Sequence, residues 1–220
     1  NLHVNYDYTS KNKRLHLLSN AFFTQDNNRL NGSINGILEQ VITSAPNYPA
    51  HTDENEYYWF SEEYNNPVAL LESYYKAKTG NFNFSNSISY SLVRNLTLKA
   101  AIGYNRIGIN ELSAYPANSK NIFPFPQMAT SNFGKKHIAT LLAEPQVVYT
   151  SKLLGGNFEF LVGSTIQGSV TEGKFSIVGN FQSEDLLEDP QKGLVFFSDS
   201  VDIVYKYISG FARISSNWHE

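Results

Sequence analysis

Cysteine is absent from this 220-residue chain, and several features of ordinary soluble proteins are scarce. Without a thiol there is no disulfide framework, no thiolate metal site and no cysteine nucleophile. No stretch approaches the roughly 18 consecutive apolar residues of a transmembrane helix. Charged residues make up only 17% of the chain, against roughly 25% in an average soluble domain. The net charge is −3 with no basic run, which argues against a nucleic-acid partner.

Sequence signatures of catalysis are missing as well. The chain has no G-x-S-x-G, no H-E-x-x-H, no phosphate-binding loop and no dinucleotide-binding fingerprint. The histidines lack the spacing of metal ligands; they are His3, His16, His51, His137 and His219. We therefore predict that the chain is not an enzyme and that it has no catalytic residues, no metal site and no cofactor.

Two groups of carboxylates are candidates for cation sites. Asp53, Glu54 and Glu56 form the first, and Glu184, Asp185, Glu188 and Asp189 form the second. Carboxylate oxygens suit a hard cation. A solvated loop, or charge at a helix end, explains both groups more simply, so no metal is predicted at either.

The strongest pattern in the chain is a two-residue alternation between residues 81 and 105. Phe82, Ile88 and Tyr90 fall on one side, and small Asn and Ser residues fall on the other. After the corner Val93-Arg94-Asn95 the alternation restarts, which predicts an antiparallel hairpin. Each apolar side is continuous over about ten residues, the length that a tilted strand needs to cross a bilayer.

Other segments fit the same template, and the total is about seven strands. The further strands are expected at residues 2–9, 14–25, 136–151, 157–168 and 205–218. Connections alternate strictly between short (Ser10–Arg14, Val93–Asn95, Leu153–Gly156) and long (27–80, 106–135, 169–203). Short periplasmic turns and long extracellular loops are typical of outer-membrane barrels, whereas structureless loops beyond about 15 residues are uncommon in compact domains.

Large rings gather at one end of the expected strands. Five of them lie on the apolar sides close to the short turns: Tyr8, Tyr90, Tyr149, Phe158 and Trp218. Amphipathic rings prefer the headgroup level of a bilayer, so this arrangement favours an aromatic girdle. Aromatic residues at the strand ends of a sandwich core are the alternative.

Two short helices are expected within the long connections. Asn66 and Pro67 supply an N-cap and a first helical residue before Val68–Ser73. Residues 183–188 could form another helical turn before Pro190. The chain also begins inside an alternating strand, which suggests a fragment of a longer protein.

Four stretches resemble the SusC-like (RagA-like) TonB-dependent transporters of the outer membrane. In chain order they are Ala45–Pro49 with Asp53 and Tyr57-Tyr58; Asn66-Pro67-Val68-Ala69; Leu142–Gln146 with Tyr149; and Val162–Gln167. Pro145 lies inside the third, where it would break a ladder bond unless it marks a bulge. The order of the stretches is more specific than any one of them.

The resemblance implies an all-β fold, namely an antiparallel up-and-down segment of a transmembrane β-barrel. Family barrels have about 22 strands, so residues 1–220 would form a partial barrel domain without the plug, the TonB-contacting segment or the remaining strands. It further implies import of an oligosaccharide or peptide in the outer membrane of a Gram-negative bacterium. The implied partners are a SusD-like surface lipoprotein, TonB and outer-membrane lipid.

One loop has the composition of a solute-binding surface. Tyr57, Tyr58, Trp59 and Tyr64 lie beside Phe60 and three carboxylates. Aromatic faces stack on sugar rings and carboxylates accept hydroxyl hydrogen bonds, so we expect these four residues to contact substrate. Packing of the rings against neighbouring loops is the alternative.

Ten polar residues on the opposite side of the strands would contact the plug, water or passing solute: Asn5, Asp7, Ser87, Ser89, Lys99, Glu144, Gln146, Glu159, Gln167 and Arg213.

Two other functions remain open. A soluble or secreted β-sandwich that binds carbohydrate would bury Phe82, Ile88, Ile102 and Phe160 in a shared core. An outer-membrane barrel enzyme would need Ser, His and Asp near the loops, and no spacing supports it.

Overall fold

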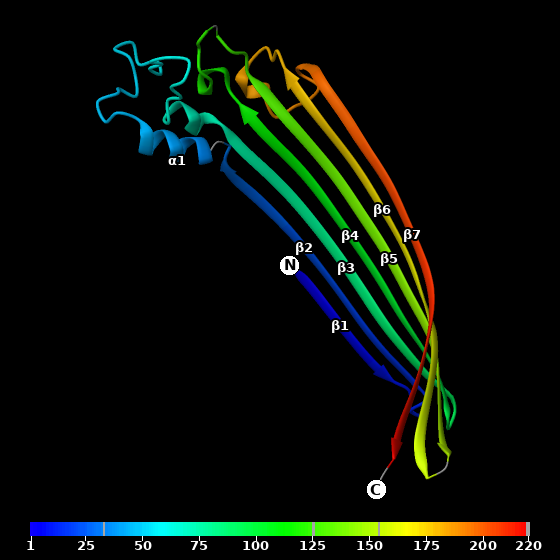
Figure 1. The fold of residues 1–220 in the computed structure, drawn as a ribbon. Helices are drawn as coiled ribbons and strands as arrows, with labels where there is room; N and C mark the ends of the chain where they lie inside the picture. The colour runs from blue at the N-terminus through cyan, green and yellow to red at the C-terminus, as the bar shows by residue number, and fades with distance from the viewer. Residues whose placement is uncertain (33, 125, 154, 219–220) are drawn as a thin grey trace.

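Seven antiparallel strands form one sheet in which every strand pairs with its neighbours in sequence (Figure 1). The computed structural model describes residues 1–32, 34–124, 126–153 and 155–218. The strands are β1 (Leu2–Thr9), β2 (Leu15–Asn31), β3 (Tyr74–Val93), β4 (Leu96–Tyr115), β5 (Thr130–Leu153), β6 (Gly156–Gly179) and β7 (Leu194–Trp218). This order confirms the all-β, up-and-down architecture predicted from the alternation.

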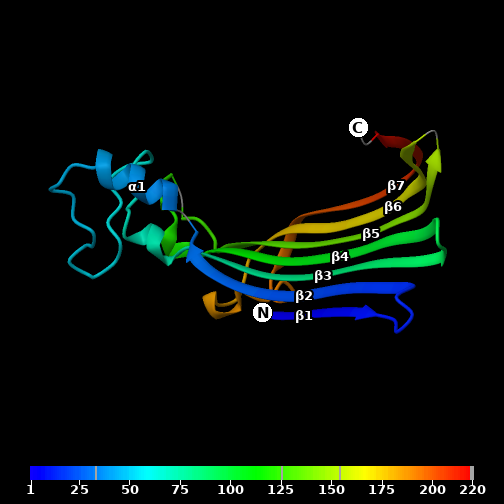
Figure 2. The ribbon, with the colours of Figure 1, turned by 90° about the horizontal axis from the view of Figure 1, so that it is seen from below.

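The strands lie side by side along a long, twisted sheet, with the short turns at one end and the long connections at the other (Figures 1 and 2). The first two short turns fall where the sequence places them. The third includes residue 154 and lies partly outside the described residues. His219 also lies outside the described residues.

The strands are longer than the sequence pattern predicted. The long connections shrink to residues 32–73, 116–129 and 180–193. The predicted boundaries were wrong because alternation is visible only where one face is apolar. Asp26 to Arg29 are polar on both faces, yet they pair in register with Lys76 to Thr79. The backbone ladder continues regardless of side-chain type, since each residue supplies its own donor and acceptor.

The ladder assigns every strand residue to one of two faces, because side chains alternate and register partners share a side. We call the side that carries Phe82, Ile102 and Phe160 the apolar face. The opposite side, which carries Ser87 and Lys99, is the polar face. All ten polar residues predicted to share a side lie on the polar face by this register.

Among the residues that the structure describes, no second layer covers the middle of the apolar face. Phe82 is 37% exposed, Ile102 is 38% exposed and Ile214 is 70% exposed. A sandwich would have buried these side chains between two sheets. The soluble sandwich is therefore contradicted, and the apolar face remains available for contact with an apolar medium.

Pro145 interrupts one ladder without creating a bulge. The β5–β6 register runs from Ala143↔Ile166 to Gln146↔Gly163, so Glu144 and Pro145 make no ladder pair with β6. The register on either side is unchanged, because the two pairs keep the same offset. A hydrogen bond from Thr165 Oγ1 to Glu144 Oε1, at 3.1 Å, spans the gap.

Helical structure is confined to the long connections. They hold α1 (Ile34–Thr43) and three 3₁₀ turns, η1 (Ala69–Glu72), η2 (Ala117–Ser119) and η3 (Glu184–Leu186). The two predicted helices are thus short 3₁₀ turns. Helix α1 was missed because Gly36 and its β-branched residues have weak helix propensity.

Among the described residues, no helix combines the length and the apolar character needed to cross a bilayer.

A small core lies at the loop end of the apolar face. Leu112, Ala114 and Leu187 are buried there. Four partly buried residues pack against them: Tyr74, Ala129, Phe133 and Phe181. Since Leu187 belongs to the β6–β7 connection, that connection folds back over the end of the sheet.

Candidate solute-binding surface

The three long connections meet at one end of the sheet and are held in place by polar side chains. Asn66 is fully buried in the β2–β3 connection. Its amide donates to the carbonyl oxygens of Ala50 (2.7 Å) and Tyr58 (3.0 Å). Its Oδ1 accepts from the backbone N–H of Val68 (2.9 Å) and Ala69 (3.3 Å). The predicted N-cap was placed two residues early, because the N-cap of η1 is Val68, but Asn66 still accepts from the N–H groups at the start of that turn and closes the loop that precedes it.

Asn121 joins two different connections. Its amide donates to the carbonyl oxygens of Ser61 (2.8 Å), Glu62 (3.2 Å) and Tyr64 (2.9 Å). Its Oδ1 accepts from the N–H of Phe123 at 2.9 Å. Lys120 next to it donates to Met128 O and Thr130 Oγ1. Burial lowers the pKa of Lys120, and these acceptors offset part of the cost.

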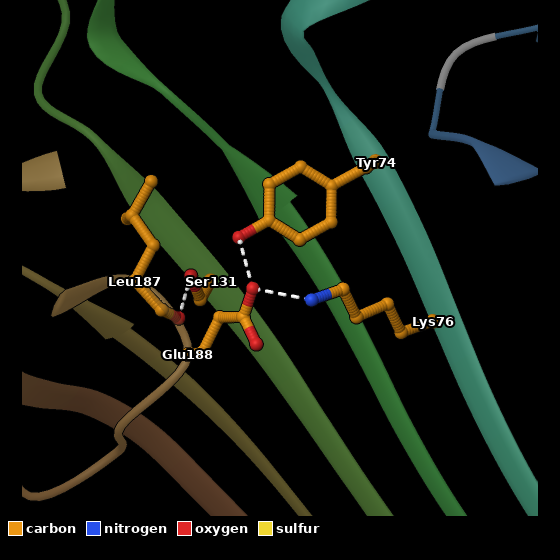
Figure 3. A network of polar contacts seen from close by, with 5 residues as sticks. All are labelled: Tyr74, Lys76, Ser131, Leu187 and Glu188. Carbon is orange, nitrogen blue, oxygen red and sulfur yellow. Dashed lines mark hydrogen bonds and ion pairs between the residues drawn. The ribbon is translucent and has the colours of Figure 1, made fainter. Parts of the chain in front are cut away.

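The β6–β7 connection is attached through Glu188 (Figure 3). Its carboxylate accepts from Lys76 Nζ at 2.5 Å and from the Tyr74 hydroxyl at 3.1 Å. The hydrogen bond from Lys76 holds the pKa of Glu188 below its usual value. Beside it, buried Ser131 donates to the Leu187 carbonyl at 2.7 Å. These contacts bring β3, β5 and the connection into one unit.

The predicted aromatic residues lie within this assembly, and two of them make structural contacts. Tyr57 donates its hydroxyl to Glu72 Oε1 at 2.6 Å and lies 5.0 Å from the His51 ring. The hydrogen bond to Glu72 raises the pKa of Tyr57 to about 12. Tyr64 is only 8% exposed and makes an edge contact with Tyr48, with centroids 5.1 Å apart.

The other rings are more accessible. Phe60 is 53% exposed and stacks on Tyr48 at 4.7 Å. Tyr58 and Trp59 are partly exposed. On this loop, Tyr64 is buried, Tyr57, Tyr58 and Trp59 are partly exposed, and Phe60 is the most exposed ring.

The polar face carries polar side-chain pairs near the short turns. Arg213 Nη2 forms an ion pair with Glu159 Oε1 at 2.6 Å, and His16 Nε2 lies 2.9 Å from Asp7 Oδ1. Near the short turns, a hollow of about 860 Å³ is lined mostly by polar residues, including Asn157, Glu159 and Ser215. This surface would be costly to bury against lipid and suits contact with water or a polar protein surface.

Two carboxylates of the second group accept hydrogen bonds from backbone N–H groups. Glu184 accepts from the Ala117 N–H at 3.0 Å, and Asp189 accepts from the Gln191 N–H at 2.9 Å. Across the described part of the chain, no group of three or more His, Asp or Glu residues is placed to hold a metal ion.

Asn121 is the residue of this site that sequence reasoning missed. Asparagine is common in loops, and nothing near Asn121 in sequence indicates that its partners lie 57 to 60 residues away. Asn66 was predicted only as a helix cap, through the local Asn-Pro signal. Its contacts to Ala50 and Tyr58 have no local signature.

Comparisons with known proteins bear on the fold. No protein-family model matches the chain, and no curated protein matches it. Three solved structures match over 98% of the chain at 12–14% identity. They are the RagAB peptide importer in its closed-closed state (14% identity, TM-score 0.73), the RagAB peptide transporter (12%, 0.72) and the importer in its open-open state (14%, 0.69).

The chain spans about a quarter of each matched chain, which is 25%, 26% and 25% respectively. At this identity the likeness concerns the fold, and it confirms the resemblance to a segment of a RagA-like barrel.

Proposed function

We propose that this chain is a wall segment of an outer-membrane transporter that imports an oligosaccharide or a peptide in a Gram-negative bacterium. The observation that carries the proposal is the uncovered apolar face of a single sheet whose other face is polar. Hydrocarbon can solvate the first face and an aqueous passage the second. The match to a quarter of a peptide importer supports the same conclusion.

In this proposal the chain provides passage and makes or breaks no covalent bond. The polar face lines the lumen, where Lys99, Glu159 and Arg213 meet the plug, water or solute. The rest of the barrel, the plug and the segment that contacts TonB belong to other parts of the protein. A SusD-like lipoprotein would close over the long connections, as the name RagAB suggests for the matched complex.

The loop that carries Tyr57, Tyr58, Trp59, Phe60 and Tyr64 provides the proposed substrate contact. This loop is held rigid by Asn66 and Asn121, so its rings are positioned before solute arrives. Preorganisation lowers the entropic cost of binding. Trp59 and Phe60 offer the accessible faces, while Tyr57 and Tyr64 hold the loop in shape.

Fractionation tests the membrane placement. We expect the intact protein to sediment with outer membranes and to require detergent for release. Recovery in the aqueous fraction without detergent would overturn the proposal. Uptake of labelled oligopeptides and oligosaccharides by cells with and without the protein then identifies the class of substrate.

The loop is tested by replacing Trp59 and Phe60 with alanine. We expect solute affinity to fall by roughly tenfold, since each ring contact is worth about 0.5–1.5 kcal/mol. Leu71→Ala is the matched control, because Leu71 is 58% exposed in the same connection and is not aromatic. Unchanged uptake in the double variant would remove these rings from the binding site.

A further inference from the structure

A group of cations begins on the apolar face where its apolar residues end. We call Lys78, Arg106, Lys135 and Lys174, together with His137, which lies among these cations, the cationic rim. Arg106 lies in register with Phe82 and Ala139, so it directly borders the last apolar row. Four residues further along the strands, Lys78, Asn110, Lys135 and Lys174 form one register row on the same face. The row between these two holds Gly80, Gly108 and His137 together with the acidic residues Glu172 and Asp202.

Arg106 and His137 form the first part of the rim. Arg106 Nη2 lies 2.6 Å from His137 Nε2, so the guanidinium donates to a neutral imidazole. Gly80 and Gly108 are register partners beside this pair. A Cβ at Gly108 would lie 3.2 Å from His137 Cε1, so glycine leaves room for the ring.

These residues border a hollow of about 490 Å³ in the surface. Its remaining walls are the rings of Phe23, Phe82 and Tyr104. One side of the hollow is therefore aromatic and the other is a guanidinium. An occupant must offer apolar chains next to an anionic group.

Lys135 and Lys174 form the second part of the rim. They are direct register partners, so their side chains leave neighbouring strands on the same face. Like charges directly opposite each other destabilise a sheet. Within the part of the chain described, neither lysine forms an ion pair. They border a second hollow of about 350 Å³ together with His137 and Glu172.

We infer that the cationic rim binds the phosphate groups of an outer-leaflet glycolipid, whose acyl chains lie along the apolar face. The inference rests on the proposed membrane placement. Charge complementarity favours it, because an anion between Lys135 and Lys174 relieves their repulsion and Arg106 can bind phosphate through two parallel N–H donors. A free phosphate ion has no apolar part that could contact the aromatic wall beside Arg106.

The test uses the intact protein, purified in neutral detergent, with bisphosphorylated lipid A as the probe in native mass spectrometry. A cation beside an anionic lipid surface is worth roughly fivefold in affinity. For Arg106→Gln combined with Lys135→Gln and Lys174→Gln we therefore expect a loss on the order of 100-fold. Lys136→Gln is the matched control, since Lys136 is also exposed but lies on the polar face.

Equal binding of lipid A by the triple variant and the unmodified protein would overturn the inference. So would equal binding of dephosphorylated lipid A by the unmodified protein, a comparison that needs no variant to fold. Full competition by millimolar inorganic phosphate would show a free-anion site and also overturn it. Failure of the protein to fractionate with membranes would refute the membrane placement itself, which separates the two conclusions.

Discussion

The side-chain amide of Asn121 lies 2.9 Å from the carbonyl oxygen of Tyr64, across 57 residues of sequence. One amide thereby holds the β2–β3 and β4–β5 connections together. An NH₂ group has two protons, so its three carbonyl partners share them. The aromatic loop keeps its shape through this contact and through Asn66, although most of its other contacts are local.

Replacing Asn121 with alanine should loosen the aromatic loop while leaving the sheet intact. The change leaves buried or half-buried carbonyl groups without a donor, at a local cost of about 1–3 kcal/mol. Limited proteolysis should therefore cut residues 57–64 faster. Asn118→Ala is the control, because Asn118 is exposed in the same connection. Equal cleavage rates in the two variants would contradict the role of Asn121.

Lowering the pH should release the β6–β7 connection. The pKa of Glu188 is lower in the folded protein, chiefly because Lys76 donates to its carboxylate. Such a group contributes stability above its unfolded pKa, and the contribution is lost as the pH falls through the lower folded value. The Glu188 side chain is 50% exposed, so the contribution is no more than about 1 kcal/mol.

Hydrogen exchange of residues 180–193, followed from pH 7 to pH 3, measures this release. Glu188→Gln should show fast exchange already at neutral pH and a weaker dependence on acid. Asp189→Asn serves as a control within the same connection, because Asp189 accepts only a local hydrogen bond from Gln191. A wild-type pH profile in Glu188→Gln would refute the prediction.

A charge should be tolerated on one face of β3 and not on the other. Ile88 lies on the apolar face, in register with Leu17 and Ala100. We expect Ile88→Lys to destabilise the membrane-inserted protein by about 1–2 kcal/mol, a cost between those of a cation at mid-bilayer and near the interface. Ser87→Lys, one residue away on the polar face, should cost far less. Urea unfolding in lipid vesicles compares them, and similar losses would argue against lipid contact.

Residues 1–220 expressed alone should aggregate in water and dissolve only in detergent. The apolar face is uncovered, and in the part of the chain described β1 and β7 each pair along one edge only. Unpaired edges and large apolar patches both promote association. A monodisperse, detergent-free monomer would require the apolar face to be covered in some other way.

The central strands could be predicted from sequence because their two faces differ. In the segment from Phe82 to Tyr104, one face is apolar and the other is small and polar, so the strand period is visible. The parts of the longer strands that lie nearer the loops lack that contrast, and their strand structure was not predicted from the sequence. Pro145 was correctly predicted to lie in a strand. It leaves a gap in the pairing of β5 with β6 and does not form a bulge.

The loop aromatics illustrate a second limit. Composition located Tyr57, Tyr58, Trp59 and Tyr64 on one loop, but it could not separate a buried support such as Tyr64 from an exposed ring such as Phe60. That difference depends on Tyr48, which packs against both.

Local alternation by itself determined that this chain forms a meander of strands with one apolar and one polar face, because side-chain direction in a strand follows from a period of two. The tertiary structure alone decided which residues meet across long separations. Asn121 reaches Tyr64, Glu188 reaches Lys76, and Arg106 meets His137 beside two glycines. Such contacts depend on register and on loops folding back over the sheet, and neither leaves a periodic trace in the sequence.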